Sequence, residues 1–480
     1  MKTRRFKNKE MIRKELENLE LVYKTSITPF FPICQVGRNY SRKFSDIFSL
    51  DNEPQTLAVV ITPDGVNWFF PRTLKPIAIE YIDKLISNKA IFNQILAKEK
   101  ILSQELLRVI KTPVSDLVDK GRATTLGIER FNRILDLYFQ YGYVTDVPGF
   151  LFQVYAVDYF KERIAKQLYQ SDQAALATDE KLDLLLTSPG YTNYENFLRD
   201  LVRIKSQRSL SAAARRWNWL VHDYIGDIID EKYLAAKIKQ LSKKQINKDL
   251  RQARARIGAI KELEKLLPPR ARREIDTVHS FLWIYNERKK LILNQVNIYL
   301  RHLFEARFPG LVFSRLRELY QRRPQDLEKI FSSQRPLSDY LRRKKFIYLI
   351  KSGRIDNGPD SYSALIKGAV LSPGKTLQGR SASPGVVRGR VNVVLNISQI
   401  SKFVPGSILV APFTNVNYLP IMGKASAILT ETGGLTSHAA IVSRELKVPC
   451  IVGIPHLLAN LYDGQEVEVD ANEGLVKIIK

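Results

Sequence analysis

The chain has 480 residues, of which 45% are apolar, and it carries a formal net charge of +26. A single core stops growing at about 250–300 residues, so we expect two or three domains. No apolar run approaches the roughly 20 residues of a membrane span, and the N-terminus lacks the apolar segment of a signal peptide. Two cysteines far apart in the sequence argue against a disulfide framework. These features predict a cytoplasmic protein that does not contact a membrane.

The basic charge is concentrated before residue 378. Residues 378–480 hold nine Lys and Arg against seven Asp and Glu, so the rest of the chain carries nearly all of the excess. Such an excess attracts nucleic acid, nucleotide, an anionic membrane surface or an acidic partner subunit. Many basic proteins bind none of these specifically, so the charge alone leaves the function open.

The first 75 residues are predicted to form a small N-terminal segment. Residues 8–23 have the composition of a basic helix. Residues 56–71 contain two apolar runs around the turn Pro63-Asp64-Gly65, which predicts a β-hairpin.

Residues 76–350 have the apolar spacing of helices and are predicted to form an α-helical domain. The longest helix is expected to begin after Asp276-Thr277 and to end before Pro309-Gly310. Aromatic stripes at helical spacing are expected to be core. The basic clusters are expected to be mostly solvated helix faces. These clusters are 215–216, 251–256, 270–273 and 342–345.

Residues 351–377 are rich in turn-forming residues and are predicted to form a linker. From residue 378 to 480 the apolar period changes to two, which is typical of strands. We expect short strands at 391–395, 407–411, 426–430, 467–469 and 475–479. The predicted fold class is multidomain α+β, with a large mainly α-helical N-terminal region followed by a compact domain of β-layers and helices.

One stretch of this last domain carries recognisable chemistry. An apolar run ends at Leu429, Gly433 and Gly434 turn the chain, and an alanine-rich helix is predicted to begin at His438. A histidine there lies beside free backbone N–H groups and the positive end of the helix dipole, which suits a group that gains a phosphoryl charge. Its ring can act as a nucleophile, and the glycines allow close approach of another molecule to the backbone.

Three further side chains are candidates for supporting that histidine. Thr436 and Ser437 are good N-cap residues and would offer hydroxyls to a phosphoryl group. Arg444 lies about two helical turns further on. It would either neutralise phosphoryl charge or brace the Gly-Gly loop through Glu445, and the sequence does not decide between these roles.

The stretch resembles the phosphohistidine signature of the PEP-utilising enzymes, such as phosphoenolpyruvate synthase and pyruvate phosphate dikinase. The similarity extends from Gly379 to Asp470. The matching residues are Gly433-Gly434, Thr436 to Ile441, Arg444 to Leu446, Pro449 and Val452-Gly453. The resemblance implies a compact β/β/α swivelling (mobile) domain that carries a phosphoryl group on His438.

The chain also departs from that family. Family members carry Thr, one residue, Pro and an acidic residue upstream of the histidine, where this chain has Thr414-Asn415-Val416-Asn417. We find no glycine-rich phosphate loop typical of an ATP-grasp domain. The barrel that binds phosphoenolpyruvate or pyruvate is not expected either, because the sequence stops at Lys480.

The resemblance therefore implies a phosphotransferase subunit with a separate ATP-grasp partner protein and an unknown small-molecule acceptor. The helical region 76–350 resembles in layout and position the substrate-binding region of family members, which implies that it is an acceptor-binding domain. Mg²⁺ and ATP, or phosphoenolpyruvate, would be bound at the donor step on the partner, and no cofactor would be bound stably by this chain. One alternative is a non-enzymatic phosphohistidine regulator. Another is a basic nucleic-acid-binding protein with a passenger swivel domain.

The remaining histidines offer no comparable context. No Cys and His have metal-site spacing, so no metal site is predicted. Each of these histidines is expected to be a surface residue or a hydrogen-bonded core residue. They are His222, His279, His302 and His456.

Overall fold

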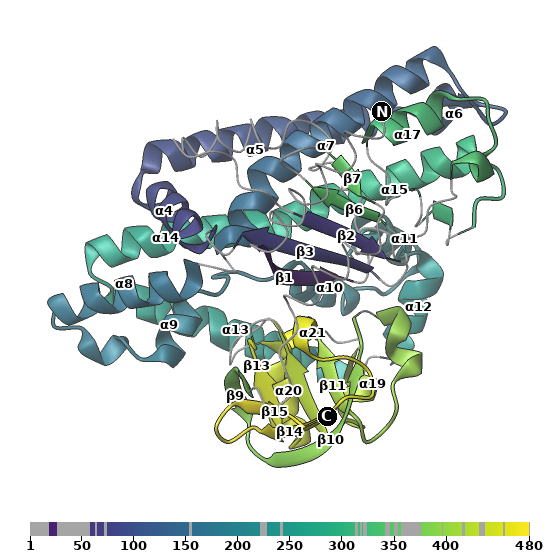
Figure 1. The fold of residues 1–480 in the computed structure, drawn as a ribbon. Coiled ribbons are helices and arrows are strands. Elements are labelled where there is room, and N and C mark those ends of the chain that lie inside the picture. Colours follow the sequence, from purple (N-terminus) through teal and green to yellow (C-terminus); the bar gives the residue numbers. More distant parts are fainter. Residues whose placement is uncertain are drawn as a thin grey trace, which may run out of the picture. The chain divides into compact units, whose positions relative to one another are not determined.

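The computed structural model describes residues 19–25, 58–62, 65–71, 74–152, 156–220, 228–240, 243–312, 315–316, 319, 324–340, 346–349, 354–356, 376–395, 397–414, 418–431, 437–454 and 457–479. The chain divides into two compact units (Figure 1). One comprises Met1–Thr28, Asn39–Leu74 and Arg343–Lys480, and the other Pro29–Arg38 and Lys75–Arg342. No described helix is long and apolar enough to cross a membrane.

The predicted hairpin is confirmed as part of a five-stranded antiparallel sheet. Its strand order is β1-β3-β2-β6-β7. The hairpin strands are β2 (Ala58–Thr62) and β3 (Gly65–Pro71), and their register pairs Thr62 with Gly65. The other strands are β1 (Leu19–Thr25), β6 (Phe346–Leu349) and β7 (Arg354–Asp356).

Two predictions were wrong here. Residues 19–23 form a strand rather than the end of a helix, because β1 pairs with β3 along its length; residues 8–18 lie outside the described part. β6 and β7 fall in the segments assigned to the helical domain and the linker. β6 forms backbone hydrogen bonds with β2, and β6 and β7 pair with each other. Strand partners distant in the sequence therefore decide the conformation of this segment.

The second unit is mainly helical, as predicted. The described helices are α4 (Leu74–Ser87), α5 (Lys89–Val109), α6 (Val114–Leu117), α7 (Thr125–Leu151), α8 (Val157–Gln170), α9 (Asp179–Leu185), α10 (Asn193–Leu201), α11 (Gln207–Trp217), α12 (Glu231–Gln240), α13 (Lys243–Leu266), α14 (Pro269–Trp283), α15 (Lys289–Arg307) and α17 (Pro324–Ser332). A short antiparallel pair, β4 (Val118–Asp119) and β5 (Arg122–Ala123), lies between α6 and α7.

The long helix begins earlier than predicted. α14 starts at Pro269 and continues through a π-helical turn, Ile284–Arg288, into α15. Pro at the first helical position is favourable because its fixed φ suits the helix and its missing N–H would have no helical partner there. The predicted end is confirmed, since α15 stops at Arg307 and Gly310 adopts a left-handed φ of 80°.

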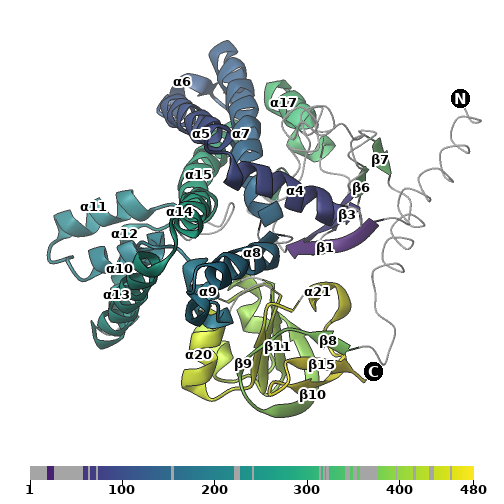
Figure 2. The same cartoon turned by 90° about the vertical axis from the view of Figure 1, so that its left-hand side faces the viewer.

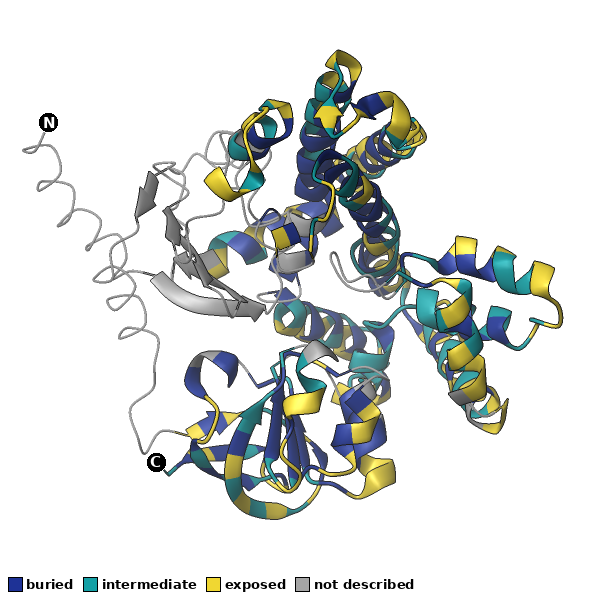
Figure 3. Ribbon diagram, turned by 90° about the vertical axis from the view of Figure 1, so that its right-hand side faces the viewer, coloured by how far each residue is buried: buried dark blue, intermediate teal, exposed yellow. Residues whose placement is uncertain are grey.

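The aromatic stripes are core, as predicted. Phe131, Phe304 and Phe331 are fully buried, and the rings of Phe131 and Phe331 stack with centroids 4.2 Å apart. In Figure 3 the helices carry buried residues along one face and exposed residues along the other. The stripes thus hold α7, α15 and α17 together.

The C-terminal domain is built on an eight-stranded sheet. Its order is β8-β15-β14-β10-β11-β12-β13-β9, with parallel pairing from β10 to β13 and antiparallel pairing elsewhere. The strands are β8 (Thr376–Gln378), β9 (Arg380–Ser383), β10 (Val386–Val393), β11 (Ile408–Ala411), β12 (Ala427–Thr430), β13 (Cys450–Val452), β14 (Glu466–Asp470) and β15 (Leu475–Ile478). All the predicted strand regions are confirmed, whereas β8, β9 and β13 were not predicted.

Both faces of the central strands are buried. Along β12, Ala427 and Leu429 face one core and Ile428 faces the other. The sheet curls, so residues of β8, β14 and β15 and residues of β10 to β13 contribute to the same first core. This core is closed by α21 (Leu457–Asn460). The second lies under α19 (Leu419–Met422) and α20 (His438–Leu446), as Figure 2 shows for α20. Burial on two faces explains why these parallel strands read as continuous apolar runs.

Candidate functional site

The predicted signature lies where a buried strand passes into a helix. β12 ends at Thr430, and α20 begins at His438 with Ser437 as its N-cap. The Ser437 hydroxyl oxygen accepts the backbone N–H of Ala440 at 3.4 Å, which satisfies one of the donors that a helix start leaves free. The helix closes with Lys447 in the left-handed region at φ 55°. The predicted helix start and the capping role of Ser437 are therefore observed.

His438 occupies the first helical position of α20. Its backbone N–H is one of those at the helix start that have no intrahelical acceptor, and it lies at the positive end of the helix dipole. The side chain of His438 lies outside the described part, as do Gly433, Gly434 and Thr436. Their roles in holding a phosphoryl group stay predictions.

A buried hydroxyl that sequence reasoning missed lies at the end of β12. Thr430 is fully buried, and its Oγ1 has no hydrogen-bond partner among the described residues. Its position in the strand alternation places it on the face that α20 covers. A polar residue at the carboxyl end of a buried parallel strand was the signal available in the sequence.

The loop that follows Thr430 is fixed at its start. A carboxylate oxygen of Glu431 accepts the backbone N–H of Leu458 at 2.7 Å, near the beginning of α21. The Glu431 N–H donates to the carbonyl oxygen of Ala411. These two bonds anchor the point where the chain leaves the sheet toward the signature loop.

The Arg444 side chain makes a contact that neither proposed role anticipated. Its Nε donates to the carbonyl oxygen of Ala382 at 2.8 Å, which ties α20 to β9. Arg444 lies six residues after His438, or about 9 Å along the helix axis at 1.5 Å per residue. The observed bond therefore supports the sheet on which α20 packs.

Two of the other histidines lie in the described part. His279 is buried, and its Nε2 lies 2.6 Å from the carbonyl oxygen of Leu185, as expected for a hydrogen-bonded core histidine. His302 is exposed. His222 and His456 lie outside the described residues.

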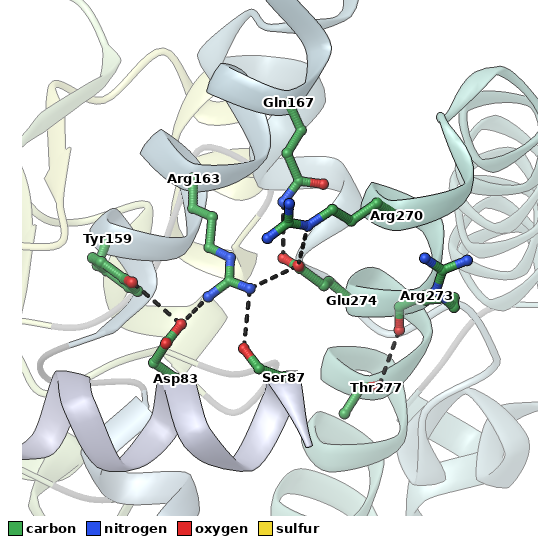
Figure 4. Close-up of polar contacts among 9 residues, drawn as sticks. All are labelled: Asp83, Ser87, Tyr159, Arg163, Gln167, Arg270, Arg273, Glu274 and Thr277. Carbon is green, nitrogen blue, oxygen red and sulfur yellow. Dashed lines mark hydrogen bonds and ion pairs between the residues drawn. The ribbon is translucent and has the colours of Figure 1, made fainter. Parts of the chain in front are cut away.

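The helical unit contains a network of charged groups that joins three helices (Figure 4). The guanidinium of Arg163 on α8 pairs with Asp83 on α4 and, at 2.7 Å, with Glu274 on α14. Tyr159 donates to the same Asp83 carboxylate, and Gln167 donates to Glu274. Each charge has an opposite partner, so the network joins α4, α8 and α14, and loss of one partner would leave a largely buried charge unpaired.

A small pocket lies beside this network. Its volume is about 230 Å³, and it is lined by Tyr159, Glu162, Arg163, Lys166, Gln167, Gln170 and Arg270. Arg163 is paired with Asp83 and Glu274, whereas the exposed Lys166 has no ion pair among the described residues and is the cation of the lining that is available to a ligand. Arg270 also lies 3.6 Å from Glu274. The lining is polar and suits a small anion.

Comparison with known proteins assigns the C-terminal domain. Residues 403–474 match the family model "PEP-utilising enzyme, mobile domain". Phosphoenolpyruvate synthase of Pyrococcus furiosus is 42% identical over 130 residues, which are 27% of this chain and 16% of the relative. A probable phosphoenolpyruvate synthase of Archaeoglobus fulgidus is 38% identical over 161 residues, 32% of this chain and 19% of the relative.

A solved structure of aconitase X from Thermococcus kodakaraensis is 20% identical, with 22% of this chain and 100% of that chain covered. Its TM-score is 0.19, too low to inform fold or function. The chain spans less than a fifth of the length of the curated relatives named above. The similarity to the phosphoenolpyruvate synthases lies in the C-terminal region of this chain, and there the chain contains the mobile domain of the PEP-utilising enzyme family.

Proposed function

We propose that the chain is a phosphotransferase subunit that carries a phosphoryl group on His438. The observation that carries this proposal is the position of His438 as the first residue of α20, within a match to the PEP-utilising mobile domain. The relatives of that domain are named phosphoenolpyruvate synthases, which are phosphotransferase-type enzymes. The free N–H groups at the start of α20 would favour the charge that phosphorylation adds.

The chemistry consists of two transfers. A ring nitrogen of His438 attacks the phosphorus of the donor, a P–N bond forms, and the donor's P–O bond breaks in line with the attack. In the second step an acceptor oxygen attacks phosphorus, and the P–N bond breaks. A covalent intermediate divides one difficult transfer into two easier ones.

The donor in this proposal is a separate ATP-grasp protein that binds Mg²⁺ and ATP, with phosphoenolpyruvate as the alternative phosphoryl source. The acceptor is a small anionic molecule bound by the helical unit. The pocket beside Arg163 supports this class of acceptor, because Lys166 and Arg270 offer it positive charge. Lys166→Gln should then slow discharge of the phosphohistidine to the acceptor without slowing its formation.

The decisive experiment measures phosphorylation of His438 directly. The full chain is incubated with labelled ATP and the candidate donor protein and, in parallel, with phosphoramidate, which phosphorylates reactive histidines without a partner. The label should be acid-labile and base-stable, and His438→Ala should abolish it. Phosphoramidate labelling without donor labelling would indicate a wrong donor. Label that persists in His438→Ala would show that the wrong residue was chosen.

A second function rests on the basic charge of the helical region. Exposed cations occur along α13, at Lys243, Lys244, Arg251 and Arg254. The same helix also uses Arg256 internally, because its guanidinium binds both oxygens of the Glu195 carboxylate. Nucleic-acid binding would show as a gel shift whose affinity falls steeply with salt concentration. The phosphohistidine regulator would instead be labelled on His438 and transfer the group to no acceptor.

A further inference from the structure

A cluster of one histidine and two carboxylates lies in the helical unit. His279 and Asp276 are one helical turn apart on α14, so they share a face of the helix, and Glu264 lies in the last turn of α13. One ligand atom of each residue lies within 4.8 Å of the others. His279 is buried, Glu264 is partly buried and Asp276 is exposed. The cluster therefore opens to solvent on the side of Asp276.

A hydrogen bond fixes which nitrogen of His279 carries the proton. Nε2 lies 2.6 Å from the carbonyl oxygen of Leu185, the last residue of α9. A carbonyl oxygen can only accept, so Nε2 carries the hydrogen. The bond also satisfies one of the carbonyl groups that the end of α9 leaves free. In the neutral ring, Nδ1 then presents a lone pair.

That lone pair faces negative charge. Nδ1 lies 3.2 Å from a carboxylate oxygen of Glu264, and Asp276 contributes a second carboxylate to the cluster. Among the ion pairs of the described residues, neither carboxylate is paired with Lys or Arg, whereas neighbouring Glu262 is paired with Lys265. Three lone-pair donors that converge in this way suit a cation bound between them.

We propose that Glu264, Asp276 and His279 bind a divalent transition-metal ion, with Zn²⁺ as the representative ion. A histidine ligand whose other ring N–H donates to a backbone carbonyl is the usual arrangement at protein metal sites. Bonds of about 2.0–2.2 Å place tetrahedral ligands about 3.3 Å apart, close to the observed separation of Nδ1 and the Glu264 oxygen. The exposed Asp276 can close the remaining distance by rotation of its side chain.

The proposed site leaves one coordination position for water or a ligand. Three protein ligands with an open fourth position are typical of zinc sites that bind a substrate or water, whereas four are typical of structural sites. A nitrogen ligand disfavours Mg²⁺ and Ca²⁺, which prefer oxygen. The bound ion would also link α13 to α14 across the short connection between Leu266 and Pro269.

The test uses the full chain carrying His438→Ala, so that the signature histidine cannot contribute to binding. After treatment with a chelator, the protein is titrated with Zn²⁺ by calorimetry and with Co²⁺ by visible absorption. We expect saturable binding of one ion at this site and a Co²⁺ spectrum of low coordination number. Glu264→Gln and Asp276→Asn should each weaken binding at least tenfold and remove that spectrum.

The matched control is Glu262→Gln, an exposed carboxylate on the same helix two residues from Glu264. It should leave the affinity and the spectrum unchanged. Circular dichroism of each variant checks that the helices are intact. Absence of saturable binding at micromolar Zn²⁺, or equal binding by the parent, Glu264→Gln and Asp276→Asn, would overturn the proposal. The phosphorylation of His438 is measured on the unmodified chain, so its outcome does not depend on this result.

Discussion

The role of Arg444 can be settled by one substitution. Arg444→Gln removes the charge and the hydrogen bond from Nε to the carbonyl oxygen of Ala382. A hydrogen bond from a charged group contributes about 1.5–3 kcal/mol when buried, and Arg444 is largely exposed, so we expect a loss of about 1–2 kcal/mol. The loss should appear in β9, which contains Ala382.

Hydrogen exchange followed by mass spectrometry measures this loss locally. A decrease of about 1–2 kcal/mol in the free energy of local opening speeds amide exchange roughly 5–30-fold. We expect this acceleration in peptides that cover residues 380–383 and little change in the helical unit. If the bond to Ala382 is the main contribution of Arg444, phosphorylation of His438 by phosphoramidate should proceed at nearly the parental rate.

Two further variants separate charge from geometry. Arg388→Gln is the matched control, because Arg388 lies on β10 and pairs with Glu466 at a solvent-exposed position, where an ion pair contributes little. Arg444→Lys keeps the charge but loses the planar guanidinium, so the amides of β9 should exchange as fast in this variant as in Arg444→Gln. The reasoning would be refuted if exchange in β9 were unchanged while Arg444→Gln slowed phosphorylation tenfold and Arg444→Lys restored it.

Three other substitutions test the packing of the C-terminal domain. Thr430→Val should slow amide exchange in β12 by up to about tenfold, because it removes a buried hydroxyl without a described partner; unchanged or faster exchange would indicate that the hydroxyl is bonded in solution. Gly379→Ala should destabilise the domain by about 1–3 kcal/mol, since the added methyl would lie 2.5 Å from Ile454 Cγ1 and 2.9 Å from the Val452 carbonyl oxygen. Its control is Gly423→Ala, whose methyl would meet Leu446 at 3.9 Å, and equal unfolding midpoints for the two would contradict the expectation. Burial raises the pKa of Cys450 to about 12, whereas an unfolded thiol has a pKa of about 8.5. The folded domain thus keeps a proton that the unfolded chain loses, so stability should fall as pH rises from about 9 toward 12. Cys450→Ala should remove this part of the decline, which urea unfolding of both proteins at several pH values, monitored by circular dichroism, can measure.

The strands and the site helix of the C-terminal domain were predictable because local and tertiary preferences agree there. β11 and β12 are continuous apolar runs, since both faces of each strand are buried. Ser437 and the residues after it carry their own helix start signal. In such segments the local sequence preferences agree with the global fold, so the local pattern predicts the conformation.

The parts that escaped prediction depend on partners distant in the sequence. β6 forms because it pairs with β2, nearly 300 residues earlier, and β9 is held by β13 and by the Arg444 bond. The carboxylate of Glu264 comes to His279 from another helix, so no spacing of Cys and His could indicate the cluster. The sequence shows Thr430 only as a polar residue at the end of an apolar run, and its burial without a described hydrogen-bond partner depends on the tertiary structure.

The new boundaries also limit how a mobile domain could work in this chain. The predicted linker 351–377 shortens at both ends, because β7 extends to Asp356 and β8 begins at Thr376 and pairs with β15. The buried side chain of Leu377 makes β8 part of the domain core, so an isolated domain should begin no later than residue 376. At about 3.3–3.6 Å per residue, the segment between Asp356 and Thr376 spans at most about 70 Å when fully extended. If the C-terminal domain moves about this segment, the length of the segment therefore limits how far β8 can move from β7.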